Sequence, residues 1–294
     1  NKDTQVLPSF NIAWDATDDL VIRGAIAKVI SRPDYSDLGA QQRITYVSGE
    51  WAEDRAAFNE LPGFSGSGGN KNLKPFESIQ ADLSIEYYYG EGSAVGLALF
   101  HKKVDNFVVP LVIDVEQNFA GKNNIVDAGT INIAPYSTVG NGTDAVSKGA
   151  EVFIQHAFDS GFGFYANYTY NKTNKADVTI NGEEFGQSAL IGSAKYQYNT
   201  SVYYEGGYFN VRASYNKRGE TVLGLNSGLN VYQDPYEQID VNGSVNLYDG
   251  LSLTAAVINL TKSESVTRLG NDTDARLLNT SYSGRRFYAG FNYS

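Results

Sequence analysis

Residues 78–89 (SIQADLSIEYYY) decide the fold class, because their apolar and polar side chains alternate strictly. A β-strand turns successive side chains to opposite faces, so this stretch predicts a strand with one apolar and one polar face. The apolar face carries Ile79, Ala81, Leu83, Ile85 and Tyr87, and the polar face carries Gln80, Asp82, Ser84 and Glu86. The same alternation recurs at residues 162–171, 209–218, 239–247 and 286–294, which predicts an all-β, antiparallel chain.

The connections between these segments alternate in length. Short turns rich in Gly, Asp and Ser predict tight hairpins, and the long, polar, Gly-rich connections are expected to be loops. Eleven strands are predicted, at about 7–15, 20–31, 78–89, 94–105, 148–158, 163–172, 192–204, 209–218, 236–248, 251–261 and 280–294. The long loops are predicted at about 32–77, 106–147, 173–190, 219–235 and 262–279. Short turns on one rim and long loops on the other are typical of an outer-membrane barrel.

The apolar face of such a sheet has two possible surroundings. It packs on a second protein layer in a soluble β-sandwich and meets lipid in a membrane barrel. The 21 Tyr and 15 Phe residues cluster at strand ends, as at residues 87–89 and 203–204, and aromatic girdles produce that placement at membrane interfaces. The polar faces carry long series of Asn, Gln, Ser and Thr, as a hydrated lumen requires. We therefore favour the barrel and keep the sandwich as the alternative.

An odd number of strands raises a question about completeness. Single-chain bacterial barrels have even strand numbers, and an open sheet edge in lipid leaves backbone groups unpaired. Either the count is wrong by one strand, or the chain is part of a larger barrel. The chain begins with Asn1 rather than Met, so we expect a trimmed or partial product and favour the second explanation.

Composition argues against several classes of function. The 33 acidic residues outnumber the 23 basic ones and give a net charge of -10, which disfavours nucleic acid as a partner. Cysteine is absent and only His101 and His156 could supply imidazole, so we expect no thiolate chemistry, metal centre or cofactor. We identify no catalytic constellation and expect no enzyme.

Short motifs occur in a fixed order along nearly the whole chain. They are VLPSF (6–10), ATDDL (16–20), SRPDYSDL (31–38), GNKNLKPFE (69–77), FHKKVDNF (100–107), GAEVF (149–153), NLT (259–261) and GRRFYAGFNY (284–293). Together they resemble the C-terminal half of a TonB-dependent outer-membrane transporter. Two departures stand out. Lys71 replaces the usual Pro of its motif, and the chain stops at Ser294 where the family ends in an aromatic residue, so we expect one terminal Phe to be missing.

The resemblance implies that residues 1–294 are the C-terminal portion of a 22-stranded barrel, with the plug domain absent from the chain. The implied location is the Gram-negative outer membrane, with the long loops extracellular. The implied partners are outer-membrane lipid, the protein's own plug and N-terminal barrel half, and the TonB–ExbB–ExbD complex acting through the missing N-terminal part. The terminal strand Arg286–Ser294 would be read by the barrel-assembly machinery.

The resemblance also implies a function, namely active uptake of a large nutrient. The form Pro75–Glu77 looks most like a branch linked to carbohydrate uptake, so we predict an oligosaccharide. A ferric siderophore, or a passive porin or adhesin barrel, is the alternative. Aromatic rings stack on sugars while carboxylates and guanidinium groups bind hydroxyls. The candidate ligand contacts are Tyr46, Glu50, Trp51, Asp54, Arg55 and Phe58 in the first long loop, with Tyr136 and Tyr232 from later loops.

Overall fold

The computed structural model describes residues 4–46, 64–119, 129–248, 250–270 and 275–293. The regular structure of this part is entirely β-strand and forms two sheets. Within it, no helix is long and apolar enough to cross a bilayer.

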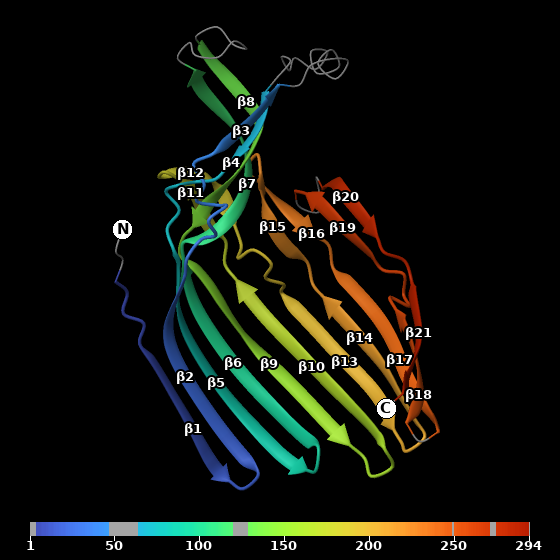
Figure 1. Cartoon of the computed structure of the whole chain (residues 1–294). Coiled ribbons are helices and arrows are strands. Elements are labelled where there is room, and N and C mark those ends of the chain that lie inside the picture. The colour runs from blue at the N-terminus through green and yellow to red at the C-terminus, as the bar shows by residue number, and fades with distance from the viewer. Residues whose placement is uncertain (1–3, 47–63, 120–128, 249, 271–274, 294) are drawn as a thin grey trace.

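The larger sheet has eleven strands, and every neighbouring pair is antiparallel. It curves into an open trough (Figure 1). In spatial order the strands are β1 (Ser9–Thr17), β2 (Leu20–Ser31), β5 (Phe76–Gly90), β6 (Ser93–Asp105), β9 (Ala145–Ala157), β10 (Phe162–Thr173), β13 (Tyr196–Glu205), β14 (Phe209–Arg218), β17 (Tyr236–Tyr248), β18 (Leu251–Ile258) and β21 (Arg286–Tyr293).

These strands confirm the eleven segments predicted from alternation. The bounds of β2, β14 and β17 coincide with the predicted ranges 20–31, 209–218 and 236–248. The last predicted segment, 280–294, is wrong at its start. Residues 280–282 belong to another strand, and β21 begins only at Arg286, because Gly284 has a positive φ of 63° between the two.

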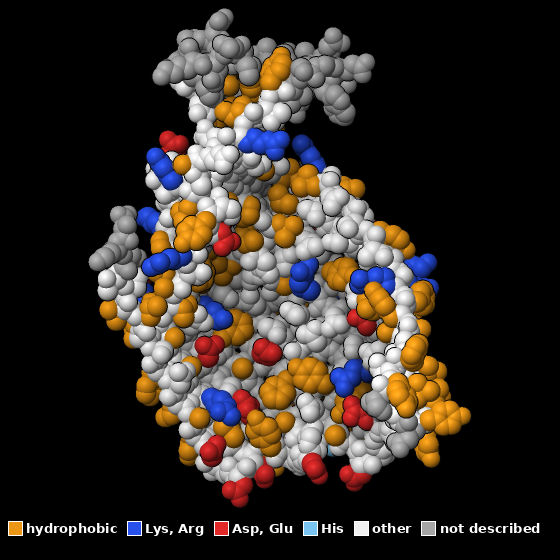
Figure 2. Space-filling view, viewed as in Figure 1, with side chains coloured by type: hydrophobic (Ala, Val, Ile, Leu, Met, Phe, Trp, Pro, Cys, Tyr) orange, Lys and Arg blue, Asp and Glu red, His pale blue; other side chains and the backbone are white. Residues whose placement is uncertain are grey.

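The convex face of the trough is apolar. Trp14, Val202 and Phe291 are 61, 57 and 75 % exposed, and they share their face with Ile85, Leu97 and the other apolar members of the alternation. No second layer of described protein covers this face. An exposed apolar belt of this extent is unfavourable in water and favourable against hydrocarbon. Figure 2 looks into the trough, and hydrophobic side chains are seen along its left and right edges.

Aromatic rings on the convex face form two bands. At the hairpin end, His156 lies between Tyr89 at 5.7 Å and Phe158 at 4.2 Å, and Tyr204 contacts Phe162 and Phe209, both at 4.8 Å. Toward the other end, Tyr198 contacts Tyr168 at 4.9 Å and Tyr196 at 5.5 Å. Two aromatic bands flanking an apolar belt are the arrangement of a membrane barrel.

The predicted long loops are not simply loops, and this prediction is wrong. They contain ten strands that form the second sheet, the outer sheet, at the open end of the trough (Figure 1). These are β3 (Gln42–Tyr46), β4 (Phe64–Gly68), β7 (Phe107–Phe119), β8 (Gly129–Gly142), β11 (Ala176–Ile180), β12 (Glu183–Ser188), β15 (Thr221–Asn226), β16 (Leu229–Gln233), β19 (Glu264–Leu269) and β20 (Arg276–Tyr282). Each of the five connections contributes one hairpin, and pairs such as β7 with β15, which run parallel, join the hairpins to one another.

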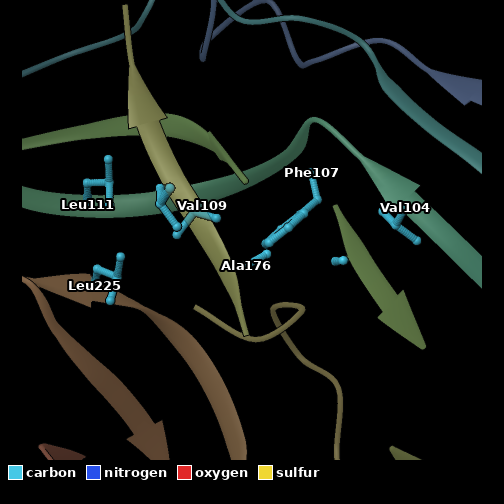
Figure 3. Packing of buried hydrophobic residues seen from close by; sticks show 8 residues of the cluster. Val104, Phe107, Val109, Leu111, Ala176 and Leu225 are labelled. Carbon is cyan, nitrogen blue, oxygen red and sulfur yellow. The ribbon is translucent and has the colours of Figure 1, made fainter. Parts of the chain in front are cut away.

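The hydrophobic core lies at the base of the outer sheet rather than inside the trough. It consists of Val104, Phe107, Val109, Leu111, Ala145, Ala176, Val178 and Leu225, which come from β6, β7, β9, β11 and β15 (Figure 3). Gly142 borders this core. The ring of Phe107 packs on the Gly142 backbone, where an added Cβ would collide with it. The core therefore packs strands from three of the predicted loops, 106–147, 173–190 and 219–235, against one another.

Candidate functional site

The concave face of the trough is a mainly polar wall, although the rings of Phe100 and Phe153 lie on it over Gly149 and Gly96. Asn199 Nδ2 donates to Asn167 Oδ1 at 2.8 Å, and Asn171 Nδ2 donates to Ser193 Oγ at 2.6 Å. Gln238 Nε2 donates to both carboxylate oxygens of Asp240, at 2.7 and 2.8 Å. Neutral amides and hydroxyls predominate, so a polar molecule moving along this wall can exchange one hydrogen bond for another.

A pocket of about 450 Å³ opens where this wall meets the outer sheet. We call it the mouth pocket. Its lining consists of Arg218, Gln233, Tyr236, Ser263, Ser265, Ser281 and Ser283. Arg218 and Tyr236 oppose each other in the β14–β17 register on the lumen face, and the other residues come from β16 and from β19, β20 and the segments beside them.

Hydrogen bonds orient the polar groups of the mouth pocket. Arg218 Nη2 donates to Gln233 Oε1 at 2.5 Å, and Gln233 Nε2 donates to Ser265 Oγ at 2.7 Å. Tyr236 OH donates to Gln238 Oε1 at 2.7 Å. The buried Nε of Arg218 has no acceptor among the described residues. The pocket thus presents one guanidinium, one amide, one phenol and four hydroxyls, a set that recognises hydroxyl-rich ligands.

The charged groups beside the mouth pocket already bond one another. Arg268 Nε donates to Asp234 Oδ1 at 2.6 Å, and Nη2 of the same guanidinium bonds Glu220. The guanidinium also lies over the ring of Tyr232, 5.0 Å from its centroid. This cluster joins β16 and β19 to the segment before β15, and its two carboxylates exceed its single positive charge.

The structure places the predicted contacts in different surroundings. Tyr232 lies next to Gln233 of the mouth pocket, beneath Arg268. Tyr46 is 49 % exposed on the outer sheet, with its ring 5.2 Å from Phe64. Tyr136 is only 5 % exposed and packs against Gly66 and Gly68. Tyr232 and Tyr46 are therefore accessible at a surface, whereas Tyr136 is buried and packs within the outer sheet.

The remaining predicted contacts, Glu50, Trp51, Asp54, Arg55 and Phe58, lie outside the described residues. Sequence reasoning missed Arg218, Gln233 and the four serines of the mouth pocket. Each is an ordinary polar residue at a strand end, and only the register of five strands brings them together.

A model of known families matches residues 1–260, under the description TonB dependent receptor-like, beta-barrel. The chain belongs to this TonB-dependent receptor family. The match covers most of the chain and agrees with the trough, its apolar belt and its polar wall. The family and the fold place the chain in the outer membrane.

Solved receptors share the fold of this TonB-dependent receptor chain. A mutant of the ferric enterobactin receptor PfeA from Pseudomonas aeruginosa, in complex with enterobactin, has a TM-score of 0.65 at 20 % identity, and the match covers 98 % of this chain and 40 % of that one. The siderophore receptor PirA from Acinetobacter baumannii gives 0.62 at 18 %, with coverage of 98 % and 40 %. The copper transporter OprC gives 0.58 at 15 %, with coverage of 98 % and 39 %.

A sequence relative is the iron-regulated outer membrane virulence protein of Vibrio cholerae, which is 26 % identical over 195 residues. That match covers 65 % of this chain and 28 % of the relative. The TonB-dependent receptor chain therefore spans well under half the length of the proteins it resembles.

Proposed function

We propose that the full-length protein takes up a large, hydroxyl-rich nutrient across the outer membrane, and that this nutrient is an oligosaccharide. The observation that carries the proposal is the lining of the mouth pocket, where a guanidinium, an amide, a phenol and four serine hydroxyls converge. Such groups pair with neutral hydroxyls without needing a charged ligand.

The proposed path runs from the mouth pocket along the lumen wall. A ligand released by Arg218 and Gln233 would next meet Asn216 and Gln238, which are cross-strand neighbours on the same face. Each step exchanges hydrogen bonds for similar ones, so no covalent chemistry is required. The plug domain and the TonB–ExbB–ExbD complex, acting through the part of the protein that precedes this chain, would supply the gate and the energy.

Ferric siderophore uptake is the second candidate. It is supported by the relatives, because two of the solved structures are siderophore receptors and the Vibrio cholerae relative is iron-regulated. The charge around the mouth pocket favours a neutral ligand instead, since Arg268 already bonds two carboxylates. Among the described residues that line the pocket, Arg218 supplies the one guanidinium for an anion.

Growth of a deletion strain separates the two candidates. We expect loss of growth on one oligosaccharide as sole carbon source and normal growth under iron limitation. The opposite result would replace the oligosaccharide with a siderophore. Complementation with the Arg218→Gln variant should restore growth poorly, whereas Arg212→Gln, a change at the hairpin end of the same strand, should restore it fully. Equal complementation by both variants would remove the mouth pocket from the proposal.

A further inference from the structure

Five lysines point outward from the eleven-stranded sheet, and three of them bond an acid. Lys28 Nζ lies 3.0 Å from Glu77, Lys103 Nζ lies 3.3 Å from Asp144, and Lys217 Nζ lies 3.0 Å from Glu237. A lysine on a lipid-facing surface is costly when its charge is uncompensated. These three pairs show how the protein compensates that charge within itself.

Lys148 and Lys172 are the other two outward lysines, and they face each other. They are directly opposite in the β9–β10 register, and His101 of β6 is directly opposite Lys148 on its other side. All three side chains are exposed. Among the described residues no carboxylate forms an ion pair with either lysine. We call His101, Lys148 and Lys172 the basic row.

Electrostatics make the basic row unfavourable by itself. Directly opposed side chains on neighbouring strands have Cβ atoms about 4.5–5.5 Å apart, and like charges at that spacing repel. A surface next to hydrocarbon screens this repulsion less than water does. An anion bound between the two ammonium groups would convert the repulsion into two charge-assisted contacts.

The position of the basic row identifies the source of that anion. From Lys148 to His156 the strand β9 rises about 26 Å, so a tilted strand places the basic row at the outer edge of the apolar belt. Leu99 and Leu97, which follow on the hairpin side in β6, are 46 and 42 % exposed and offer an apolar surface. A phosphate group on a lipid would therefore meet the cations while its acyl chains cover the leucines.

We propose that the basic row binds the phosphate group of a phosphorylated lipid in the extracellular leaflet. Lys148 and Lys172 supply the two ammonium donors, and a ring N–H of His101 supplies a third donor. The lipid phosphate would compensate the positive charge of the basic row, which lies on the three adjacent strands β6, β9 and β10 (Figure 1). This inference is independent of the transported nutrient.

The test uses the full-length receptor in detergent micelles. Native mass spectrometry measures the retention of added lipid A bearing two phosphates, of the same lipid A without phosphates, and of inorganic phosphate. We expect retention of the phosphorylated lipid alone, weakened about tenfold or more in the Lys148→Gln/Lys172→Gln variant. Lys217→Gln is the matched control, because Lys217 is outward but already paired with Glu237. It should leave lipid retention unchanged.

Folding of the variants is checked by retention of the heat-modifiable barrel band in electrophoresis. A Lys148→Arg/Lys172→Arg variant keeps the charge and should keep the lipid. Equal retention of the phosphate-free lipid, or an unchanged affinity in the double glutamine variant, would overturn the proposal. Binding of inorganic phosphate as tight as that of the lipid would show a free-anion site and would overturn it too.

Discussion

The backbone N–H of Asn259 donates to Asp240 Oδ1 at 2.9 Å and ties the end of β18 to the lumen face of β17. The Asn259 side chain is fully buried, and it donates to the carbonyls of Ser263 and Gly284 at 3.1 and 3.2 Å. Its Oδ1 accepts from the N–H of Ser263 at 2.8 Å. The NLT motif is therefore a polar latch at the base of the mouth pocket, between the trough and β19.

Replacing Asn259 should open this latch. Asn259→Ala leaves buried backbone groups unpaired and removes a residue suited to the positive φ of 59°, so we expect a loss of about 2–4 kcal/mol in the free energy of unfolding. Urea unfolding in detergent, followed by tryptophan fluorescence, measures it. Asn292→Ala, at an exposed lumen position, should change stability by less than about 0.5 kcal/mol. Equal effects would contradict the latch.

The outer sheet should depend on the absence of a side chain at residue 142. Gly142→Ala forces a methyl group into the Phe107 ring, and overpacking of this kind costs about 1–3 kcal/mol. Hydrogen exchange should become faster in β7 and β8 and stay unchanged in β13 and β14. Gly207→Ala is the control, because nothing lies within 4 Å of its added Cβ. Uniform acceleration across both sheets would argue against an independent outer unit.

The same substitution at two neighbouring positions of β6 should have different effects, because one side chain faces lipid and the other faces the lumen. Leu97→Arg places a charge on the lipid face and should cost about 2–4 kcal/mol. Ala98→Arg places the same charge in the lumen beside Glu151 and should be tolerated. The yield of folded barrel after refolding into lipid vesicles measures both variants. A similar loss from each would show that the convex face does not meet lipid.

Two arginines should differ in their contribution to stability. Arg268→Gln removes the ion-pair partner of Asp234 and Glu220. Because the Arg268 side chain is only 14 % exposed, we expect a loss of about 1–3 kcal/mol in the free energy of unfolding. Arg212→Gln breaks an exposed pair with Glu205 and should cost less than about 1 kcal/mol. Thermal melting of the two variants in the same detergent compares them, and a larger loss from Arg212→Gln would contradict this ranking.

The sequence by itself determined the eleven spans, their two faces and their hairpins. Alternation is a local property of the chain, and one apolar face is enough to define a strand such as β5 or β14. The family motifs follow the same order, and the structure explains some of them, as the NLT latch shows. Parts of the aromatic bands are local too, since Tyr204 contacts Phe209 across one hairpin, whereas Tyr168 meets Tyr198 only through the β10–β13 register.

Only the tertiary structure decided the rest. The outer sheet, the mouth pocket and the basic row depend on register between strands that are distant in the sequence. His101 and Lys148 become neighbours through the β6–β9 register, and Arg218 reaches Ser265 through Gln233 of a third element. The physical reason is that pairing across long connections depends on the free energy of many non-local contacts, which no short window of residues contains.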